Sequence, residues 1–131
     1  MKSVYDAIKF LASFVPNART ASEDGGAVDT VGFGSAALVI SAGTVDTADG
    51  DESYVFHVEE SDDGSTGWEP ISDTEVEITE TDEVGLIRLE GLNTGDRKRY
   101  LRASLVVGGT TPSIACSAVF ALGRAFNEPV N

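Results

Sequence analysis

Hydrophobic and polar side chains alternate with a period of two along most of this chain, and that period predicts β-strands. In the segment YVFHVEE, Tyr54, Phe56 and Val58 share one face while His57 and Glu59 lie on the other. Further strands are expected at residues 36–42, 75–79, 86–89, 99–107 and 113–122. Turn compositions such as DTADGD, DDGSTG and VGGTTP separate them, because glycine and Asx residues favour turn geometry. The pattern predicts a mainly β protein built as an antiparallel β-sandwich, either immunoglobulin-like or jelly-roll-like.

The first residues follow a helical period instead. The apolar side chains that share one helical face are Val4, Ile8, Leu11, Ala12 and Val15. Ser3 and Asp6 are placed as a capping box, and Pro16 is placed as a stop. These positions predict one N-terminal α-helix over residues 3–15, followed by a polar connecting arm over 17–26. The chain would then divide into an N-terminal helix and arm at 1–26 and a β-sandwich domain at 27–131.

Residues 113–122 carry small or apolar side chains on both faces of the expected strand. Ile114, Phe120 and Leu122 alternate with Ala115 and Val119. A strand that is apolar on both faces lies in the centre of a sandwich or is covered by another chain. We expect a central strand here.

The charge balance narrows the range of partners. Nine lysines and arginines stand against 22 aspartates and glutamates, for a net charge of -13. Such a protein is repelled by phosphate backbones and by anionic membrane surfaces. No stretch approaches the roughly 20 apolar residues of a membrane span. We therefore expect no nucleic-acid partner and no membrane partner.

Candidate catalytic chemistry is sparse. His57 is the only histidine and has no recognisable nucleophile motif beside it, and Cys116 shares an apolar face with Ile114 and Phe120. The acidic turn DTADGDE lacks the D-x-D-x-D-G frame with a glutamate at its twelfth position. We therefore expect no catalytic residue, no cofactor and no dedicated metal site, and we do not expect an enzyme. Ca²⁺ bound by the acidic loops stays an open alternative.

Two other features are candidate functional positions. Arg97, Lys98, Arg99 and Arg102 cluster near one turn, and they either pair with acids of the same chain or form a contact patch for an acidic partner. Trp68 closes the segment ESDDGSTGWEPI, and we expect it to be a buried structural anchor beside the turn. On that interpretation, Trp68→Ala would lower the melting temperature markedly.

Three blocks of sequence carry a resemblance to a known family. They are VDTVGFGSAALVISAGTVD at 28–46, YVFHVEESDDGSTGWEPI at 54–71 and RYLRASLVVGGTTPSIACSAVFALGRA at 99–125. In order and spacing they resemble a family of small proteins encoded among the head genes of tailed bacteriophages. The resemblance implies a capsid decoration, or cement, protein that binds the major capsid protein on the outer surface of the virion. It also implies a homotrimer at local three-fold positions as one form of the protein, made in the host cytoplasm.

The predicted N-terminal helix has two possible positions in such a protein. It would either fold back on its own sandwich or lie against a neighbouring subunit, with Ile8 and Leu11 as contact residues. The length of the polar arm favours the second. Two other functions stay open: a tail or head-to-tail connector component, and a glycan- or surface-binding module that would expose Trp68 or Tyr54.

Overall fold

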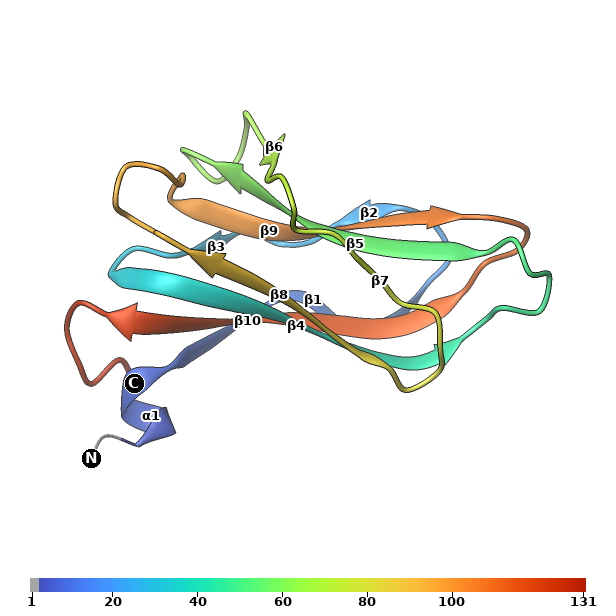
Figure 1. The fold of residues 1–131 in the computed structure, drawn as a ribbon, viewed down its shortest axis with the longest axis horizontal. Coiled ribbons are helices and arrows are strands. Elements are labelled where there is room, and N and C mark those ends of the chain that lie inside the picture. The colour runs from blue at the N-terminus through green and yellow to red at the C-terminus, as the bar shows by residue number, and fades with distance from the viewer. Residues whose placement is uncertain (1–2) are drawn as a thin grey trace.

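The computed structural model describes residues 3–131 and consists of two antiparallel β-sheets packed face to face, with a short helix at the N-terminus (Figure 1). The elements in chain order are α1 (Val4–Ala7), β1 (Lys9–Arg19), β2 (Glu23–Asp24), β3 (Val28–Asp29), β4 (Phe33–Val45), β5 (Ser53–Ser61), β6 (Glu69–Pro70), β7 (Val76–Glu77), β8 (Val84–Glu90), β9 (Tyr100–Gly108) and β10 (Ile114–Ala125). The prediction of a mainly β sandwich with one N-terminal helix is confirmed.

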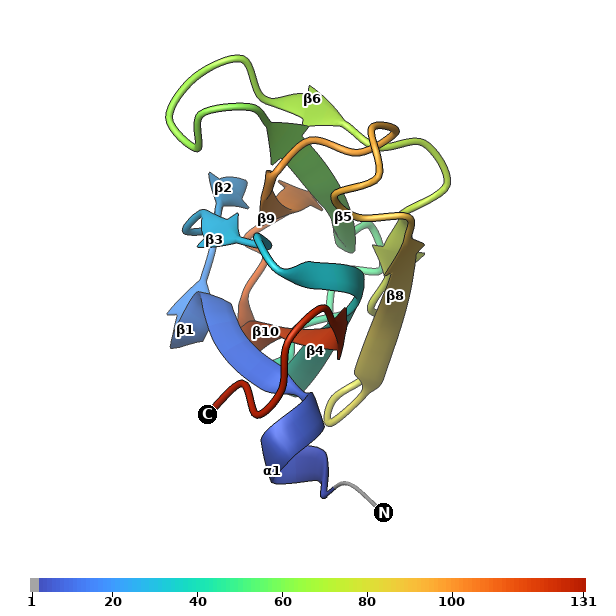
Figure 2. The same ribbon diagram turned by 90° about the vertical axis from the view of Figure 1, so that its left-hand side faces the viewer.

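The two sheets differ in their strand order. Sheet A contains four strands in the order β1-β10-β4-β8. Sheet B contains six strands. Four of them follow the order β2-β9-β5-β6, and of the other two β3 pairs with β9 and β7 pairs with β5. Figure 2 shows the two layers from one end, with β1, β10 and β4 below β9 and β5. The strand β10 pairs with β1 on one side and β4 on the other, so the prediction of a central strand for residues 113–122 is confirmed.

The core lies between the sheets and follows from the period of two. Leu38 and Ile40 of β4, Phe56 of β5 and Phe120 of β10 are fully buried. Phe14 of β1 meets Phe56 edge to face, with ring centroids 6.1 Å apart, and this contact links the two sheets. Most expected strands are present and extended by a few residues, whereas the segment 75–79 forms only the two-residue strand β7.

The predicted N-terminal helix is largely wrong. Ser3 does cap α1, since its hydroxyl accepts a bond from the Asp6 amide at 3.2 Å, but the helix ends at Ala7. Residues 9–19 form β1 at the edge of sheet A, where pairing with β10 satisfies most of the backbone groups on the side that faces it. Proline is tolerated on an edge strand, and Pro16 lies at a break in the register between Phe14 and Asn17. Six of the eight residues from Ile8 to Val15 are apolar, so the stretch does not discriminate between a helical period and a period of two.

Arg19 holds this irregular part of β1 in place. Its side chain donates to the carbonyls of Val15 at 2.9 Å, Asn17 at 3.2 Å and Cys116 at 2.9 Å. The guanidinium also lies over the Phe14 ring, 4.6 Å from its centroid. These contacts satisfy backbone groups that the register break leaves without strand partners.

The predicted connecting arm also joins the sheets. Its residues Glu23 and Asp24 form β2 and pair with Leu105 and Ser104 of β9. Ser13 of β1 donates to the Gly26 carbonyl at 2.8 Å and accepts from the Ala103 amide at 2.9 Å, which ties sheet A to sheet B. A Cβ at Gly25 would lie 2.3 Å from the Ser13 Oγ, so this approach requires glycine.

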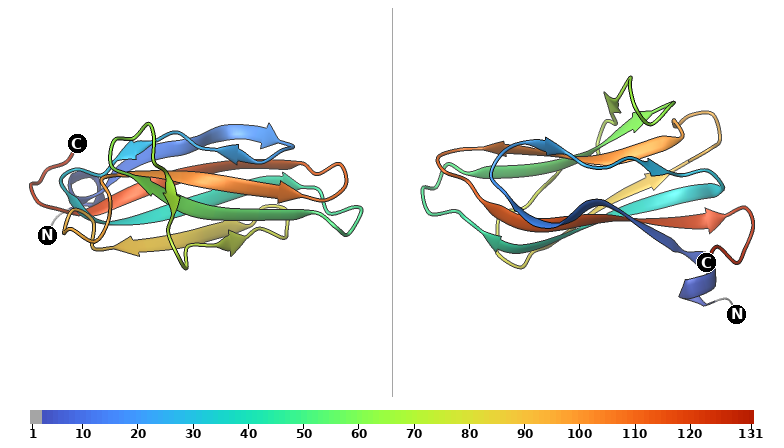
Figure 3. Two further views of the ribbon diagram at one scale, coloured as in Figure 1. Left: turned by 90° about the horizontal axis from the view of Figure 1, so that it is seen from above. Right: turned by 180° about the vertical axis from the view of Figure 1, so that it is seen from behind.

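The N-terminal helix lies beside the C-terminus of its own chain. The Val130 amide donates to the Asp6 carbonyl at 3.1 Å, and Asn131 Nδ2 donates to the carbonyls of Tyr5 and Ile8 at 2.7 and 2.9 Å. The views from the front and from behind both show α1 extending beyond sheet A, on the side away from sheet B (Figures 1 and 3).

Within residues 3–131, the structure contains no helix with the length and apolar composition of a membrane span.

Candidate functional site

The four basic residues singled out in the sequence all pair with acids of the same chain. Arg99 binds Asp29 through two bonds of 2.8 and 2.7 Å, and this lowers the pKa of the Asp29 carboxyl. The other ion pairs are Arg97 with Glu60 at 3.7 Å, Lys98 with Glu69 at 3.5 Å and with Asp62 at 3.8 Å, and Arg102 with Glu59 at 2.6 Å. Internal pairing therefore gives the cluster a structural role within the chain, and its role as a contact patch stays a prediction.

Arg102 belongs to a network that crosses the outer face of sheet B. We call it the sheet B network, formed by His57 and Glu59 of β5, Arg102 and Ser104 of β9, and Asp24 of β2. Glu59 accepts from Arg102 at 2.8 and 2.6 Å, and its other oxygen lies 3.1 Å from His57 Nε2. Asp24 meets Arg102 at 3.3 Å and accepts from Ser104 at 2.8 Å. Each charged group in the network has a partner of opposite charge or a hydrogen bond.

Trp68 lies against this network and not in the core. Its side chain is half-buried, and the Arg102 guanidinium lies 4.4 Å from the centroid of its ring. The buried residue that returns this segment to the sandwich is Ile71, which is 8% exposed. The expectation of a buried Trp68 anchor is therefore corrected, because a short strand at the sheet edge places the indole over β9 instead of between the layers.

The corner before Trp68 is held by its own side chains. Asp63 accepts from the amides of Ser65 and Thr66 at 2.9 and 2.8 Å and from the Thr66 hydroxyl at 2.8 Å. These bonds hold the pKa of the Asp63 carboxyl below its usual range. The sequence prediction of a turn at residues 62–64 is confirmed, and the turn is an Asx-type structure.

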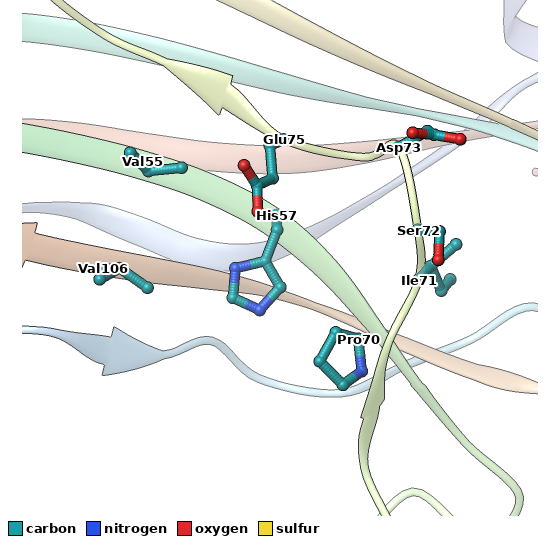
Figure 4. A pocket seen from close by; sticks show the side chains of 8 residues that line it. All are labelled: Val55, His57, Pro70, Ile71, Ser72, Asp73, Glu75 and Val106. Carbon is teal, nitrogen blue, oxygen red and sulfur yellow. The ribbon is translucent and has the colours of Figure 1, made fainter.

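A hollow of about 470 Å³ adjoins the network at His57. Val55, His57 and Val106 form its floor, and the segment from Pro70 to Glu75 forms its wall. Figure 4 shows the His57 ring between the two valines and Pro70, with Glu75 on the adjacent segment. The hollow is open to solvent and places one imidazole beside carboxylates.

The acidic turn at 46–52 is the candidate cation site. One oxygen from each of Asp49, Asp51 and Glu52 can lie within 4.8 Å of the others. Asp51 already accepts from the Thr110 amide at 3.0 Å and hydroxyl at 2.7 Å, which lowers the pKa of its carboxyl. Asp49 accepts from the Thr111 hydroxyl at 3.3 Å. These bonds join the turn to the β9–β10 loop, so the carboxylates have a structural role without a cation.

The outer face of sheet A has a different character. Outward side chains align across its four strands, because the register pairs Ala12 with Val119, Val119 with Val39 and Val39 with Leu86. The next row is Phe10, Ala121, Ala37 and Arg88. Large apolar side chains stand out on this face, with Phe10 58%, Val84 59% and Leu86 66% exposed. In the described strands, the charged side chains that alternate onto it are Arg88 and Glu90, at one end of β8.

We call this surface the sheet A face, defined by the outward side chains of β1, β10, β4 and β8. The sequence identified one strand of it, since residues 113–122 are apolar on both faces, but it did not predict the four-strand surface, although β4 and β10 carry almost no charge at their outward positions. The proposed contact residues Ile8 and Leu11 are not part of it: Leu11 packs against the core, and Ile8 is the half-buried residue that ends α1. Pairing between distant strands was needed to bring the exposed apolar positions together.

Tyr54, the other aromatic residue considered for glycan binding, is 1% exposed. Its hydroxyl donates to the Asp46 carbonyl at 2.6 Å and accepts from the Ser113 amide at 2.9 Å. Burial raises the pKa of this phenol. Tyr54 is therefore a core residue that closes one end of the sandwich.

No protein-family model matches the chain, and no curated protein is significantly similar to it in sequence.

Proposed function

We propose that this protein decorates the outer surface of a tailed-bacteriophage capsid and stabilises the lattice of the major capsid protein. The observation that carries the proposal is the resemblance of three sequence blocks to phage head proteins. In the fold these blocks supply β3 to β4, β5 to β6 and β9 to β10, which include the central strands of both sheets. The resemblance therefore covers the part of the chain that builds the sandwich.

The distribution of charge supports an exterior position. The net charge is -13, and the basic residues at 97–102 are paired with acids of the same chain. Packaged DNA would repel such a protein, whereas the outside of a shell carries no such penalty. An acidic outer layer would also keep particles apart in solution.

The stabilising mechanism follows from selective binding. A rigid sandwich that binds the assembled shell, and not the separated subunits, shifts the equilibrium toward the assembled state by mass action. Such a role needs a rigid fold. The sandwich has long paired strands, and Ser13 connects the edge strand β1 of sheet A to sheet B through hydrogen bonds. No chemical transformation is required.

The test is the number of copies in purified particles of the phage that encodes the protein. We expect a ratio to major capsid protein near one, and we expect heads that lack the protein to lose DNA at a lower temperature until purified protein is added back. A few copies per particle would instead indicate a tail or connector component. Absence from mature particles would overturn both interpretations.

The glycan-binding alternative predicts that Trp68 or Tyr54 forms an exposed aromatic platform. Tyr54 is buried, and one face of the Trp68 ring is covered by the Arg102 guanidinium. These positions favour the structural function over the glycan-binding one. Retention of the protein on a glycan array, together with failure to bind heads, would reverse this preference.

A further inference from the structure

We propose that two copies of this chain bind each other through the sheet A face, related by a two-fold axis that runs across the strands in the plane of contact. The inference goes beyond the proposed function and does not depend on it. It rests on the charge of this face, on the shape of its two ends and on the charges around them.

Two acidic molecules meet most readily where neither presents carboxylates. Each copy carries a net charge of -13, so most approaches bring carboxylates together. The central row of the sheet A face, formed by Ala12, Val119, Val39 and Leu86, carries no charge. Contact through this row buries apolar side chains and keeps the acidic loops at the edge of the contact.

The two ends of the sheet A face differ in shape. At one end Phe10 projects from β1 with 58% exposure, and α1 extends beyond the sheet with Tyr5 68% exposed (Figure 3). At the other end the register break in β1 leaves a hollow of about 500 Å³, lined mainly by small side chains. Its lining includes Pro16, Ala18, Gly43, Ala115 and Ser117.

A two-fold axis through the Val39 and Val119 row exchanges these ends. On β10, Ala121 and Ser117 lie two residues from Val119 in opposite directions. Phe10 of β1 pairs with Ala121, and Ser117 lines the hollow. The axis therefore places Phe10 of one copy over the hollow of its partner, and α1 over the region of Ala115. The hollow is lined by residues of β1, β10 and β4, and its β1 side is the part that this symmetry places opposite Phe10.

The charges at the two ends agree with the same axis. The turns at 46–52 and 79–83 surround the hollow end with acids, including Asp46 and Asp82. The α1 end carries Arg88 and Arg124, whose side chains are 82% and 76% exposed and both lie near Glu90, so these three side chains leave one net positive charge at this end. An axis across the strands brings the arginines of one copy toward the acidic end of the other. An axis along the strands would instead oppose the two acidic ends.

The size of the face predicts a reversible dimer. Four strands spaced about 4.8 Å apart and about eight residues of about 3.3 Å rise give roughly 500 Å² per copy. The sum is roughly 1,000 Å², near the lower limit for a specific interface. We therefore expect monomer and dimer to exchange with protein concentration.

The experiment uses opposite charges at Leu86, because the axis places this residue opposite its own symmetry mate. The full chain, Leu86→Glu and Leu86→Lys are studied by sedimentation velocity over a range of concentrations. We expect a concentration-dependent dimer of the parent, and a dissociation constant at least about 100-fold larger for either variant alone. An equimolar mixture of the two variants should regain the dimer. Leu86 is 66% exposed, so neither change threatens the fold.

The matched control is the pair Val106→Glu and Val106→Lys on the outer face of sheet B, where Val106 is 48% exposed. These variants should dimerise as the parent does. A parent that stays monomeric up to about 1 mM, a dimer or trimer indifferent to Leu86, or no recovery on mixing would each overturn the proposal. A monomeric parent whose binding to heads is lost in Leu86→Glu would assign the sheet A face to the capsid.

Discussion

The two outer faces of this sandwich are built on the same period of two but differ in chemistry. On sheet B the outward positions of β5 and β9 carry His57, Glu59, Arg102 and Ser104, which bond to one another and to Asp24. On sheet A the outward positions of β4 and β10 carry alanine, serine and valine. The sheet B face satisfies its polar groups within one chain. The sheet A face leaves apolar groups exposed, and only another surface can cover them.

The two faces also differ in how far the sequence predicted them. The cationic cluster at 97–102 is a recognisable feature of the sequence, and the structure shows each of its side chains paired with an acid. Of the sheet A face, the sequence predicted only that residues 113–122 are apolar on both sides, because alanine and serine form no motif. In a protein with a net charge of -13, a surface without carboxylates is the unusual feature.

The largest expected effect separates the inner and outer sides of one strand of sheet A. Leu38 is fully buried, whereas its neighbour Val39 points outward. Leu38→Ala should lower the free energy of unfolding by about 2–5 kcal/mol, because it leaves a cavity between the sheets. Val39→Ala should lower it by less than about 1 kcal/mol when measured by urea denaturation of dilute protein. Equal losses would mean that the outer side is not exposed in the monomer.

The next effect tests whether the sheet B network is self-sufficient. Arg102→Ala would leave Glu59, whose side chain is 13% exposed, without its main partner. The free energy of unfolding should fall by about 1–3 kcal/mol, since a desolvated carboxylate loses its charged donor. Arg88→Ala on the sheet A face is the control, with an expected change within about 0.5 kcal/mol because its pair with Glu90 is exposed. A loss at Arg88 as large as at Arg102 would contradict the contrast between the faces.

A smaller effect is expected for Trp68. Because the indole stacks on Arg102 and does not enter the core, Trp68→Ala should lower the free energy of unfolding by about 1 kcal/mol. The marked loss expected from the sequence should appear instead in Ile71→Ala, at about 2–5 kcal/mol. Thermal melts of both variants test the assignment, and a larger loss at Trp68 than at Ile71 would restore the sequence-based interpretation.

The smallest effect is the response of one surface pair to acid. Arg99 lowers the pKa of Asp29 from its usual value of 3.8, so the unfolded chain takes up this proton more readily than the folded one. The pair therefore stabilises the fold above that value, and its contribution is lost as the pH falls through the lowered pKa. We expect less than about 1 kcal/mol, because the pair is half-exposed.

Melting temperatures of the parent and Asp29→Asn between about pH 5 and about pH 2.5 measure this contribution. The variant should be less stable at the higher pH, and the difference should shrink in acid. A difference that stays constant across the range would show that the ion pair does not act through ionisation of Asp29.

Local pattern was sufficient for most of the fold. The long strands β4, β5, β9 and β10 were expected at nearly their observed positions, because alternation and glycine-containing turns are properties of neighbouring residues. Residues 9–15 were assigned to the helix predicted over 3–15, because most of them are apolar and the sequence does not discriminate between the two periods. Only the free edge of β10 selects the strand. Trp68 was expected to be buried for a similar reason, since Arg102, the side chain on which it stacks, is 34 residues away along the chain.

The order of residues predicts which side chains of each strand point inward, because the pleat alternates whatever the strand pairs with. The order of residues does not predict which outward side chains lie together. Strand order and register decide this, and they bring Leu86, Val39, Val119 and Ala12 into one row from four separate segments. Long-range pairing therefore created both the charged network on one side of the molecule and the uncharged face on the other.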